Sequence, residues 1–502
     1  EIEIKGYSYY RQRKQEENET GCFAAACRRA LRESISPWVP LSLLAAASKL
    51  DEAGYPIILI DQRISVDWKS DLQKALSQNP ICVGVTSMTG SQITHALEMS
   101  AFVKQHSAVP VIWGGVHATL FPLQTVEHSL VDIVVKGEGE ETFLLLALRL
   151  EQKQSLHGLE GVVYKDRGDI VNNPDRPFLD LNDLPPVPYH LIDVNKYLHR
   201  YFDEDRVLEF ETSRGCPFNC TFCYNPLYSR RRWRALSASL ILEFMQPLVE
   251  THGVKAFHFV DDGFFIDHER TREIMRGILN RKWKIKMGFQ GARIDTVDDL
   301  QDEDLELITK AGGTFLQVGV ESGSPRILDI LNKKIHPEQV LAFNRRLSRH
   351  PHMKVYYNFM CGFPTETAQD VLKTAALAWT LLRDNPYALI SAFHFYKPYP
   401  GTSLRERVIH KDDVTPSTLE GWGNFNWTQY MGRDQDADTK ALMEKIEIVS
   451  ILADRKMSYQ SDSAALRMLA AVYRPLARFR LRHGWYSWMP EHWLRKWLGD
   501  RT

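Results

Sequence analysis

The sequence lacks long apolar runs and an excess of charge of either sign. No stretch reaches the roughly 18 to 20 consecutive apolar residues that a transmembrane helix needs, and the N-terminal segment contains no apolar signal-peptide core. Lysine and arginine number 62 against 63 aspartates and glutamates, so the net charge of -1 gives no general attraction to nucleic acid or anionic lipid. We therefore expect a cytoplasmic protein that binds no nucleic acid.

The composition is that of an ordinary globular protein. Hydrophobic residues make up 44% and charged residues 25%, which excludes disorder, collagen and coiled coil as descriptions of the whole chain. A length of 502 residues exceeds that of a usual single domain, so we expect at least two hydrophobic cores.

The first part of the chain, residues 1–165, predicts an α/β domain. Short Val/Ile-rich runs at 55–61, 81–87, 110–115 and 131–140 alternate with helical patterns. Such runs are typical of a parallel, doubly wound (Rossmann-like) sheet with both faces covered. Residues 166–205 are rich in proline, aspartate and asparagine, which predicts a linker.

Residues 206–405 predict a partial (β/α)6 barrel. Six apolar strand candidates at 207–213, 256–262, 286–293, 314–322, 355–363 and 391–400 are separated by helical stretches. Functional side chains are expected at the carboxyl ends of such strands. Residues 406–502 predict a mainly helical region that caps the barrel and contacts substrate. Within it, residues 467–502 combine eight Arg/Lys with four tryptophans, which fits either membrane-surface contact or a helix packed on the barrel.

Three of the seven cysteines crowd into eight residues, in the order Cys216, Cys220 and Cys223. This CxxxCxxC spacing supplies three thiolates to a 4Fe-4S cluster and leaves one iron without a cysteine. The alternative is a zinc site, but zinc sites usually pair CxxC with a second such motif, and the sequence has none.

At these residues the chain resembles the radical SAM superfamily, whose hallmark also places an aromatic residue before the last cysteine, here Phe222. The resemblance extends from about Val207 to Leu404. It implies that S-adenosylmethionine (SAM) binds the open iron and is cleaved reductively to a 5'-deoxyadenosyl radical. An external electron donor such as flavodoxin or ferredoxin is implied as well.

The resemblance also implies SAM contacts at the strand ends. An acidic pair, Asp261 and Asp262, replaces the usual Gly-Gly-Glu, and Asp262 is the candidate for the SAM amino group. Arg293 is a candidate for the SAM carboxylate, with a structural salt bridge as the alternative. The remaining candidates are Glu321 and Ser322 for the ribose and Gly362 for the adenine. Cys361, next to Gly362, is interpreted as a buried small hydrophobe.

The α/β segment resembles the cobalamin-binding (B12-binding) domain of the cobalamin-dependent branch of this superfamily, at residues 83–93, 111–119 and 134–143. The candidate cobalamin contacts are Thr86, Ser87, Gly90, Gly114, Gly115, His117 and Gly137. The DxHxxG motif that supplies a cobalt ligand is missing, since the first histidine of the chain is His95. We assign His117 a supporting role, and the alternative is a degenerate domain that serves packing alone.

The resemblance predicts C-methylation of an unactivated carbon through methylcobalamin, on a small-molecule, natural-product or lipid substrate. Radical oxidative cyclisation or rearrangement without methyl transfer is the second interpretation. A cobalamin- or cluster-dependent sensor is a remote third. If residues 467–502 contact a membrane surface, we expect the protein to be peripherally associated with that membrane.

Overall fold

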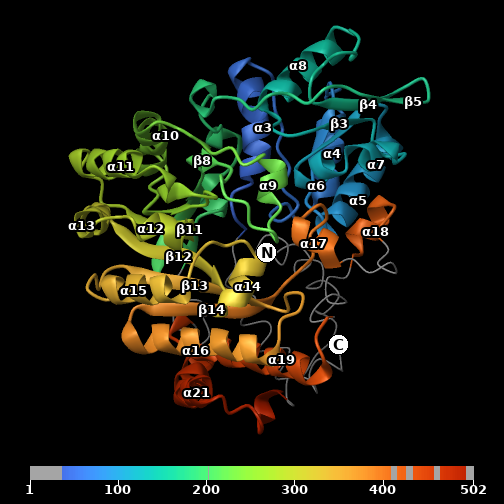
Figure 1. The fold of residues 1–502 in the computed structure, drawn as a ribbon. Helices are drawn as coiled ribbons and strands as arrows, with labels where there is room; N and C mark the ends of the chain where they lie inside the picture. Colours follow the sequence, from blue (N-terminus) through green and yellow to red (C-terminus); the bar gives the residue numbers. More distant parts are fainter. Residues whose placement is uncertain (1–36, 202, 409–414, 426–433, 457–463, 493–502) are drawn as a thin grey trace. The chain divides into compact units, whose positions relative to one another are not determined.

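The computed structural model describes residues 37–492 apart from 202, 409–414, 426–433 and 457–463. The described chain forms two compact units. The first contains residues 37–197 and 415–425, and the second contains 198–408 and 434–492. Figure 1 shows the elements of both in sequence colours. Cys22 and Cys27 lie outside the described residues.

The first unit is built on a five-stranded sheet in the order β1-β2-β3-β4-β5. Its strands are β1 (Val83–Thr86), β2 (Val111–Gly114), β3 (Ile133–Val135), β4 (Val162–Asp166) and β5 (Asp169–Asn172). The first three are parallel, and β4 and β5 add an antiparallel hairpin. The expected strand at 55–61 does not form. Pro56 donates no backbone hydrogen and Ile58 remains 53% exposed, so the segment lacks the burial of a central parallel strand.

Both faces of this sheet are covered, as predicted, because alternate strand residues enter two separate cores. Val85, Trp113 and Val134 pack on one face, whereas Ile112 and Val135 pack on the other. The helices that contribute to the first core are α4 (Trp68–Leu76), α5 (Ser91–His106), α6 (Val116–Leu120), α7 (Pro122–Glu127) and α18 (Leu419–Gly423). The opposite face is covered by α8 (Glu140–Glu151), against which α3 (Leu41–Glu52) packs. Short 3-10 turns follow at Leu181–Asp183, Tyr189–Leu191 and Val194–Lys196.

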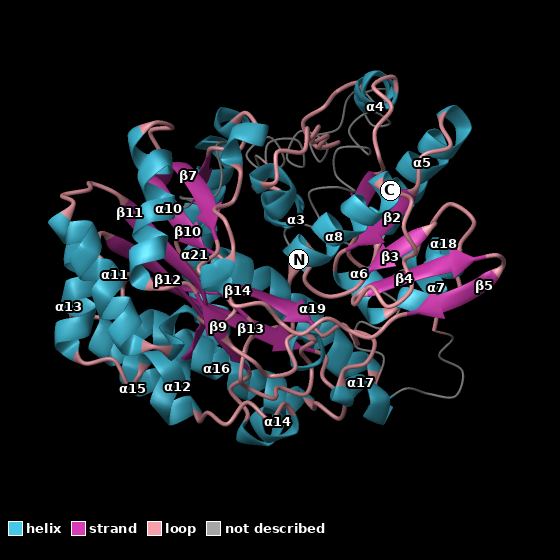
Figure 2. Cartoon of the chain, turned by 90° about the horizontal axis from the view of Figure 1, so that it is seen from above, coloured by secondary structure: helices cyan, strands magenta, loops and turns pink. Residues whose placement is uncertain are grey.

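The second unit contains a seven-stranded sheet in the order β14-β13-β12-β11-β10-β7-β6, of which Figure 2 labels all strands but β6. Its strands are β6 (His199–Tyr201), β7 (Glu204–Phe210), β10 (Ala256–Phe259), β11 (Lys286–Arg293), β12 (Gly313–Glu321), β13 (Lys354–Cys361) and β14 (Ala388–Phe395). The six strands from β7 to β14 are parallel neighbours, which confirms the partial barrel. β6 is antiparallel to β7 and lies in the range that the sequence predicted as linker.

Helices follow the parallel strands in the βα order. They are α9 (Asn225–Tyr228), α10 (Ala238–Glu250), α11 (His268–Asn280), α12 (Ile294–Val297), α13 (Asp302–Ala311), α14 (Pro325–Ile330), α15 (Pro337–Leu347), α16 (Ala368–Asp384) and α17 (Ser403–Val408), with a 3-10 turn at Phe264–Ile266. Local signals fix several of their ends. Thr367 caps α16 in a reciprocal pair with Asp370, and Gly312, at φ +112°, ends α13 in the left-handed region.

Helices α19 (Ala437–Leu452) and α21 (Ala464–His483) confirm the helical C-terminal region. The segment after α19 satisfies the outer edge of β14. The Ile390 N–H donates to Asp454 Oδ2 at 2.7 Å, and Lys456 Nζ donates to the Ile390 carbonyl at 2.7 Å. Side chains thereby replace the missing neighbouring strand. Within the described ranges, no helix is both long and apolar enough to cross a membrane.

Candidate functional site

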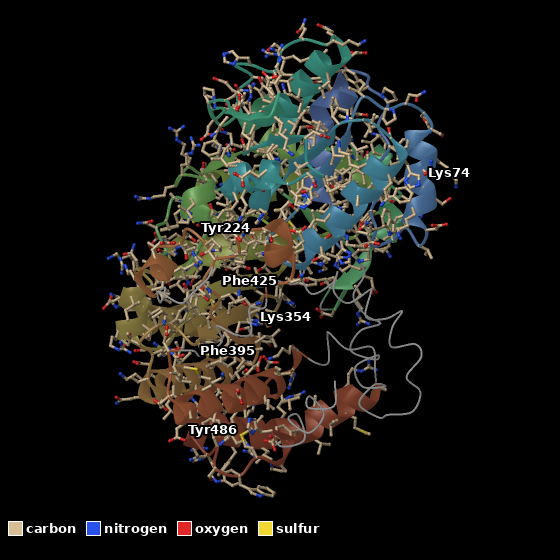
Figure 3. All side chains as sticks on the ribbon, turned by 90° about the vertical axis from the view of Figure 1, so that its right-hand side faces the viewer. Lys74, Tyr224, Lys354, Phe395, Phe425 and Tyr486 are labelled. Carbon is tan, nitrogen blue, oxygen red and sulfur yellow. The ribbon has the colours of Figure 1, made fainter. Side chains whose placement is uncertain are left out.

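The three clustered cysteines lie on one loop beyond the carboxyl end of β7. A two-stranded ribbon of β8 (Ser213–Arg214) and β9 (Arg234–Ala235) holds the base of this loop, and α9 closes it. Cys216, Cys220 and Cys223 are all free thiols with intermediate exposure. Tyr224, labelled in Figure 3, follows the last cysteine, and its ring centroid lies 6.4 Å from that of Tyr399.

The backbone around the cysteines is fixed by close contacts. Gly215 has φ +83°, and a Cβ atom there would lie 2.1 Å from the Arg232 carbonyl oxygen. Glycine is therefore required directly before the first cysteine. Thr221 anchors the middle of the loop, because its N–H donates to the Leu331 carbonyl at 3.0 Å and its hydroxyl donates to the Ile330 carbonyl at 2.9 Å.

Two of the sulfur atoms already accept hydrogen bonds. The Asn225 N–H donates to Cys223 Sγ at 3.4 Å, and Arg293 Nη1 donates to Cys220 Sγ at 3.1 Å. Such donors stabilise a thiolate. Burial acts in the opposite direction, since it raises the pKa of Cys216 and raises that of Cys223 to about 12. Burial therefore favours the protonated thiols, and a bound positive centre would be needed to stabilise the thiolates.

This donor set fits an iron-sulfur cluster. The three thiols share one loop, and a peptide N–H and a guanidinium are directed at the sulfurs of Cys223 and Cys220. In the part of the chain that the structure describes, no group of three or more Cys, His, Asp or Glu side chains converges as a single metal ion would require. Cysteines that bind a cubane need no such convergence, because each binds a different iron atom.

Arg293 at the end of β11 forms the structural salt bridge that was one of its two predicted roles. Its Nε and Nη2 atoms donate to the two carboxylate oxygens of Asp295 at 2.9 and 2.8 Å, which forms a bidentate salt bridge. Its guanidinium also lies 3.8 Å from the ring centroid of Phe218, within the cysteine loop. The salt bridge fixes the guanidinium beside Cys220, so Arg293 positions the loop even without a ligand.

The acidic pair after β10 divides into two environments. Asp261 is buried, and its Oδ1 atom accepts hydrogen bonds from the Thr212 N–H at 3.0 Å and the Ser213 hydroxyl at 2.5 Å. Burial raises the pKa of Asp261 to about 6. Asp262 is exposed and accepts the Gly215 N–H at 3.2 Å. Asp262 is therefore the more exposed member of the pair, although burial of its carboxyl group raises its pKa and Asn225 and Gly215 hydrogen-bond to it.

Glu321 ends β12 in a buried ion pair that the sequence did not predict. Its Oε1 atom lies 2.7 Å from Lys333 Nζ, and both side chains are less than 10% exposed. Glu321 also has φ +69°, a conformation that non-glycine residues seldom adopt. Ser322 lies elsewhere: its fully buried hydroxyl is 3.1 Å from Thr374 Oγ1 on α16 and accepts the Ser324 N–H at 3.1 Å. The Ser322 hydroxyl, which was the candidate for a ribose contact, is thus already hydrogen-bonded to Thr374 and Ser324.

Gly362 begins a tight turn after β13, with φ +78°. Glu366 holds this turn, because its Oε2 atom accepts the N–H groups of Gly362 at 2.6 Å and Phe363 at 3.1 Å. Burial raises the pKa of Glu366 to about 7. Phe222 packs against Phe363, with 6.2 Å between ring centroids, which joins the cysteine loop to this turn. Cys361 is 1% exposed, which confirms its interpretation as a buried hydrophobe.

In the first unit, the predicted residues gather at the carboxyl ends of β1, β2 and β3. Thr86 and Gly114 end their strands and are paired in register. The loops that follow carry the glycines with positive φ: Gly90 (+115°), Gly115 (+93°) and Gly137 (+72°). At Gly115 a Cβ atom would lie 2.7 Å from the Ser87 carbonyl oxygen, so this loop must be glycine for its own packing. A Cβ at Gly137 would meet no atom within 4 Å.

Ser87 and His117 bring unpaired polar atoms to the same edge. Ser87 Oγ and His117 Nε2 are buried and have no hydrogen-bond partner among the described residues. His117 Nδ1 lies 3.0 Å from the Thr89 hydroxyl, and burial lowers the pKa of His117 to about 4, so its ring is neutral near pH 7. Trp422 of α18 packs against this ring at 5.6 Å. Buried unpaired atoms of this kind fit a ligand that supplies the missing hydrogen bonds.

Three side chains that shape these sites were not predicted from the sequence. Lys333 and Glu366 stand in short turns, and Trp422 lies 298 positions after its hydrogen-bond partner Gln124 on α7. Their partners are set by tertiary contacts rather than by spacing. A usable signal exists for Glu366 alone, since it lies four residues after a strand-end glycine.

Comparison with known proteins gives two family matches. Residues 210–378 match the Radical SAM superfamily, and residues 30–147 match the B12 binding domain. A protein of Pyrococcus horikoshii named as an uncharacterized methyltransferase is 33% identical over 396 residues, which cover 78% of this chain and 81% of that protein.

A second relative is the anaerobic magnesium-protoporphyrin IX monomethyl ester cyclase of Cereibacter sphaeroides. It is 26% identical over 394 residues, 76% of this chain and 62% of the cyclase. Among solved structures, the cobalamin-dependent S-adenosylmethionine radical enzyme OxsB, with aqua-cobalamin and S-adenosylmethionine bound, aligns with a TM-score of 0.70. That alignment has 19% identity and covers 89% of this chain and 70% of OxsB, so it concerns the fold.

Proposed function

The chain belongs to the cobalamin-dependent branch of the radical SAM superfamily, and we propose that it is an enzyme that methylates an unactivated carbon of a small molecule. The observation that carries the proposal is the free cysteine triad on one loop with donors directed at two of its sulfurs. The methyl-transfer part is supported by the 33% identical relative named as a methyltransferase. When bound, the cluster, SAM and cobalamin supply radical generation and the methyl carrier.

We assign Cys216, Cys220 and Cys223 to the cluster and Asp262 to the SAM ammonium group, because Asp262 is the more exposed member of the acidic pair beside the loop. Arg293 holds Cys220 and keeps its positive charge near the cluster. These residues bind and orient the cluster and SAM. The proposed abstraction transfers a hydrogen atom to a radical, so it requires no general base.

The remaining SAM contacts are proposed from their positions at the carboxyl ends of β12 and β13. Glu321, held by Lys333, is the candidate for the ribose hydroxyls. The backbone of Gly362 is the candidate for the adenine, while Phe222 packs beside the same turn. We assign Ser322 to the support of the turn after β12, since its hydroxyl is already occupied by Thr374 and Ser324.

The glycine loops after β1, β2 and β3 would hold cobalamin. Glycines allow a large cofactor to approach the backbone, and sheets of this type bind ligands at the carboxyl ends of their strands. Ser87 Oγ and His117 Nε2 would provide polar contacts, because both atoms are otherwise unpaired among the described residues.

The test is anaerobic reconstitution followed by reaction with methyl-labelled SAM and a reductant. We expect iron and sulfide in the reconstituted protein, bound cobalamin, formation of 5'-deoxyadenosine, and label in the product. Cys220→Ser should abolish iron binding, whereas the matched control Cys82→Ala, outside the triad, should retain it. A wild-type chain that binds neither iron nor cobalamin would refute the proposal.

Oxidative cyclisation without methyl transfer is the second candidate, and the 26% identical cyclase favours it. The same experiment separates the two, because 5'-deoxyadenosine without label in the product indicates cyclisation or rearrangement. In either case we propose a small external electron donor of the flavodoxin or ferredoxin type.

We also propose that part of 467–502 contacts a membrane surface, although 493–502 lie outside the described residues. On α21, Met468, Val472 and Phe479 are 67%, 74% and 48% exposed, and arginines flank them. Exposed apolar residues with arginine suit an anionic lipid surface. Val472→Ser with Phe479→Ser should weaken sedimentation with anionic vesicles, while Leu279→Ser, 39% exposed on α11, should not. Equal sedimentation of all three proteins would contradict this contact.

A further inference from the structure

The two faces of the barrel sheet differ in accessibility. Along β11, β12, β13 and β14, buried residues largely alternate with half-buried ones. The buried set faces the helices, as shown by the hydroxyl of Tyr357, which donates to Asn344 Oδ1 on α15 at 3.1 Å. The half-buried set therefore lies on the inner face, which the following helices do not cover.

Two neutral amide side chains occupy this inner face on neighbouring strands, Gln317 on β12 and Asn358 on β13. Together with Gln290, which lies in the register irregularity of β11 between Phe289 and Ala292, they are here called the amide row. Gln317 Nε2 donates to Asn358 Oδ1 at 3.3 Å, which shows that the two side chains share a face. Gln317 Oε1, Asn358 Nδ2 and the Gln290 amide make no hydrogen bond to the described part of the chain. The row therefore offers both donors and acceptors.

The amide row lies close to the proposed reaction centre. Gly319 is paired in register with both Arg293 and Asn358. Gln317 precedes Gly319 by two residues, or about 7 Å of strand. Arg293 contacts Cys220 Sγ, so a group bound by the row would lie on the same side of the barrel sheet as the cysteine loop.

Aromatic rings lie beside and below the amide row, since Tyr356 is paired in register with Gln317 and Phe315 is paired with Lys354. Tyr201, His258, Phe315 and Tyr356 form an aromatic floor, with 4.4 Å between the Tyr201 and His258 ring centroids, 5.9 Å between Tyr201 and Phe315, and 6.2 Å between Phe315 and Tyr356. Phe315 precedes Gln317, and Tyr356 precedes Asn358, by two residues. Amide groups above a floor of rings suit a flat ligand that hydrogen-bonds at its edge.

We propose that the amide row recognises a neutral, planar substrate group with both a hydrogen-bond donor and an acceptor, such as a carboxamide or the edge of a heterocycle. This inference rests on the proposed function for the identity of the reaction centre. A carboxylate or phosphate would find no cationic partner on the row. A hydrocarbon would leave the amide groups without hydrogen bonds, at a cost in binding.

The test uses nicotinamide and nicotinate as probes, since they share a ring and differ in the neutral amide. Binding to the full-length reconstituted protein is measured by equilibrium dialysis without reductant. We expect saturable binding of nicotinamide and at least tenfold weaker binding of nicotinate. Gln317→Leu and Asn358→Leu, made separately, should each weaken nicotinamide binding about three- to tenfold, as for loss of one hydrogen bond.

The matched control is Gln246→Leu on the exposed side of α10, which should bind nicotinamide like the wild type. Thermal unfolding of each variant establishes that it is folded. Absence of saturable nicotinamide binding, equal binding of nicotinate, or unchanged binding in both folded row variants would overturn the inference. Because no SAM cleavage is measured, a failure here is distinct from a failure of methyl transfer.

Discussion

Gly215→Ala should displace the cysteine loop from its contacts with Arg232 and Ser229. The new Cβ atom would lie 2.1 Å from the Arg232 carbonyl oxygen and 2.8 Å from the Ser229 Cβ, whereas ordinary contact begins at 3.4 Å. The backbone before Cys216 would have to move by more than 1 Å. The left-handed conformation at φ +83° adds about 1–2 kcal/mol for an alanine. We therefore expect most of the bound iron to be lost.

The assay measures iron and sulfide per chain after anaerobic reconstitution. The control is Gly253→Ala in the same unit, where φ is +62° and the Cβ atom would lie 3.7 Å from Arg206 Nη2. Gly253→Ala carries the conformational cost without the collision, so it should bind iron like the wild type. Full iron binding by Gly215→Ala, or equal loss in both variants, would refute the reasoning.

Three further changes test the buried groups. Lys333→Met leaves Glu321 as an unpaired buried charge and should lower stability by about 3–5 kcal/mol; adding Glu321→Gln should restore most of the thermal unfolding midpoint, and no recovery would contradict the pairing. Burial raises the pKa of Glu366 to about 7, so the native state binds an extra proton between its ordinary pKa of 4.5 and pH 7, and stability falls as pH rises through that interval. Glu366→Gln should therefore raise the unfolding midpoint at pH 8 more than at pH 5, and an equal shift would contradict this. Trp422→Ala removes a fully buried ring and should cost about 3–5 kcal/mol by calorimetry, whereas Trp488→Ala, 55% exposed, should cost little.

The barrel strands could be predicted because their signal is local. Each is a run of apolar residues that is buried on the helix side, and the expected strand at 286–293 coincides with β11. The cysteine loop could be predicted for the same reason, because its three cysteines are close in sequence. At 55–61 the same apolar pattern predicted a strand that does not form. A strand also requires a neighbouring strand, and the apolar pattern does not identify that neighbour.

The partners of the site residues could not be predicted. Glu321 ends its strand as expected, yet its conformation depends on Lys333, which arrives from the turn after α14. Arg293 was assigned either to a ligand or to a salt bridge, and the structure shows that the salt bridge to Asp295 leaves Nη1 free to reach Cys220. Such choices depend on the three-dimensional neighbours of each side chain, which spacing alone does not specify.

The region after the barrel is better understood as two parts than as one cap. Trp422 is fully buried in the core of the first unit, where its Nε1 donates to Gln124 Oε1 at 2.7 Å. Asp454 and Lys456 belong to the second unit and satisfy the edge of β14. A truncation after α17 would therefore remove core residues from one unit and hydrogen bonds from the other. Any role of this region in substrate or membrane binding must be tested by substitutions at exposed positions such as Val472, which support neither core.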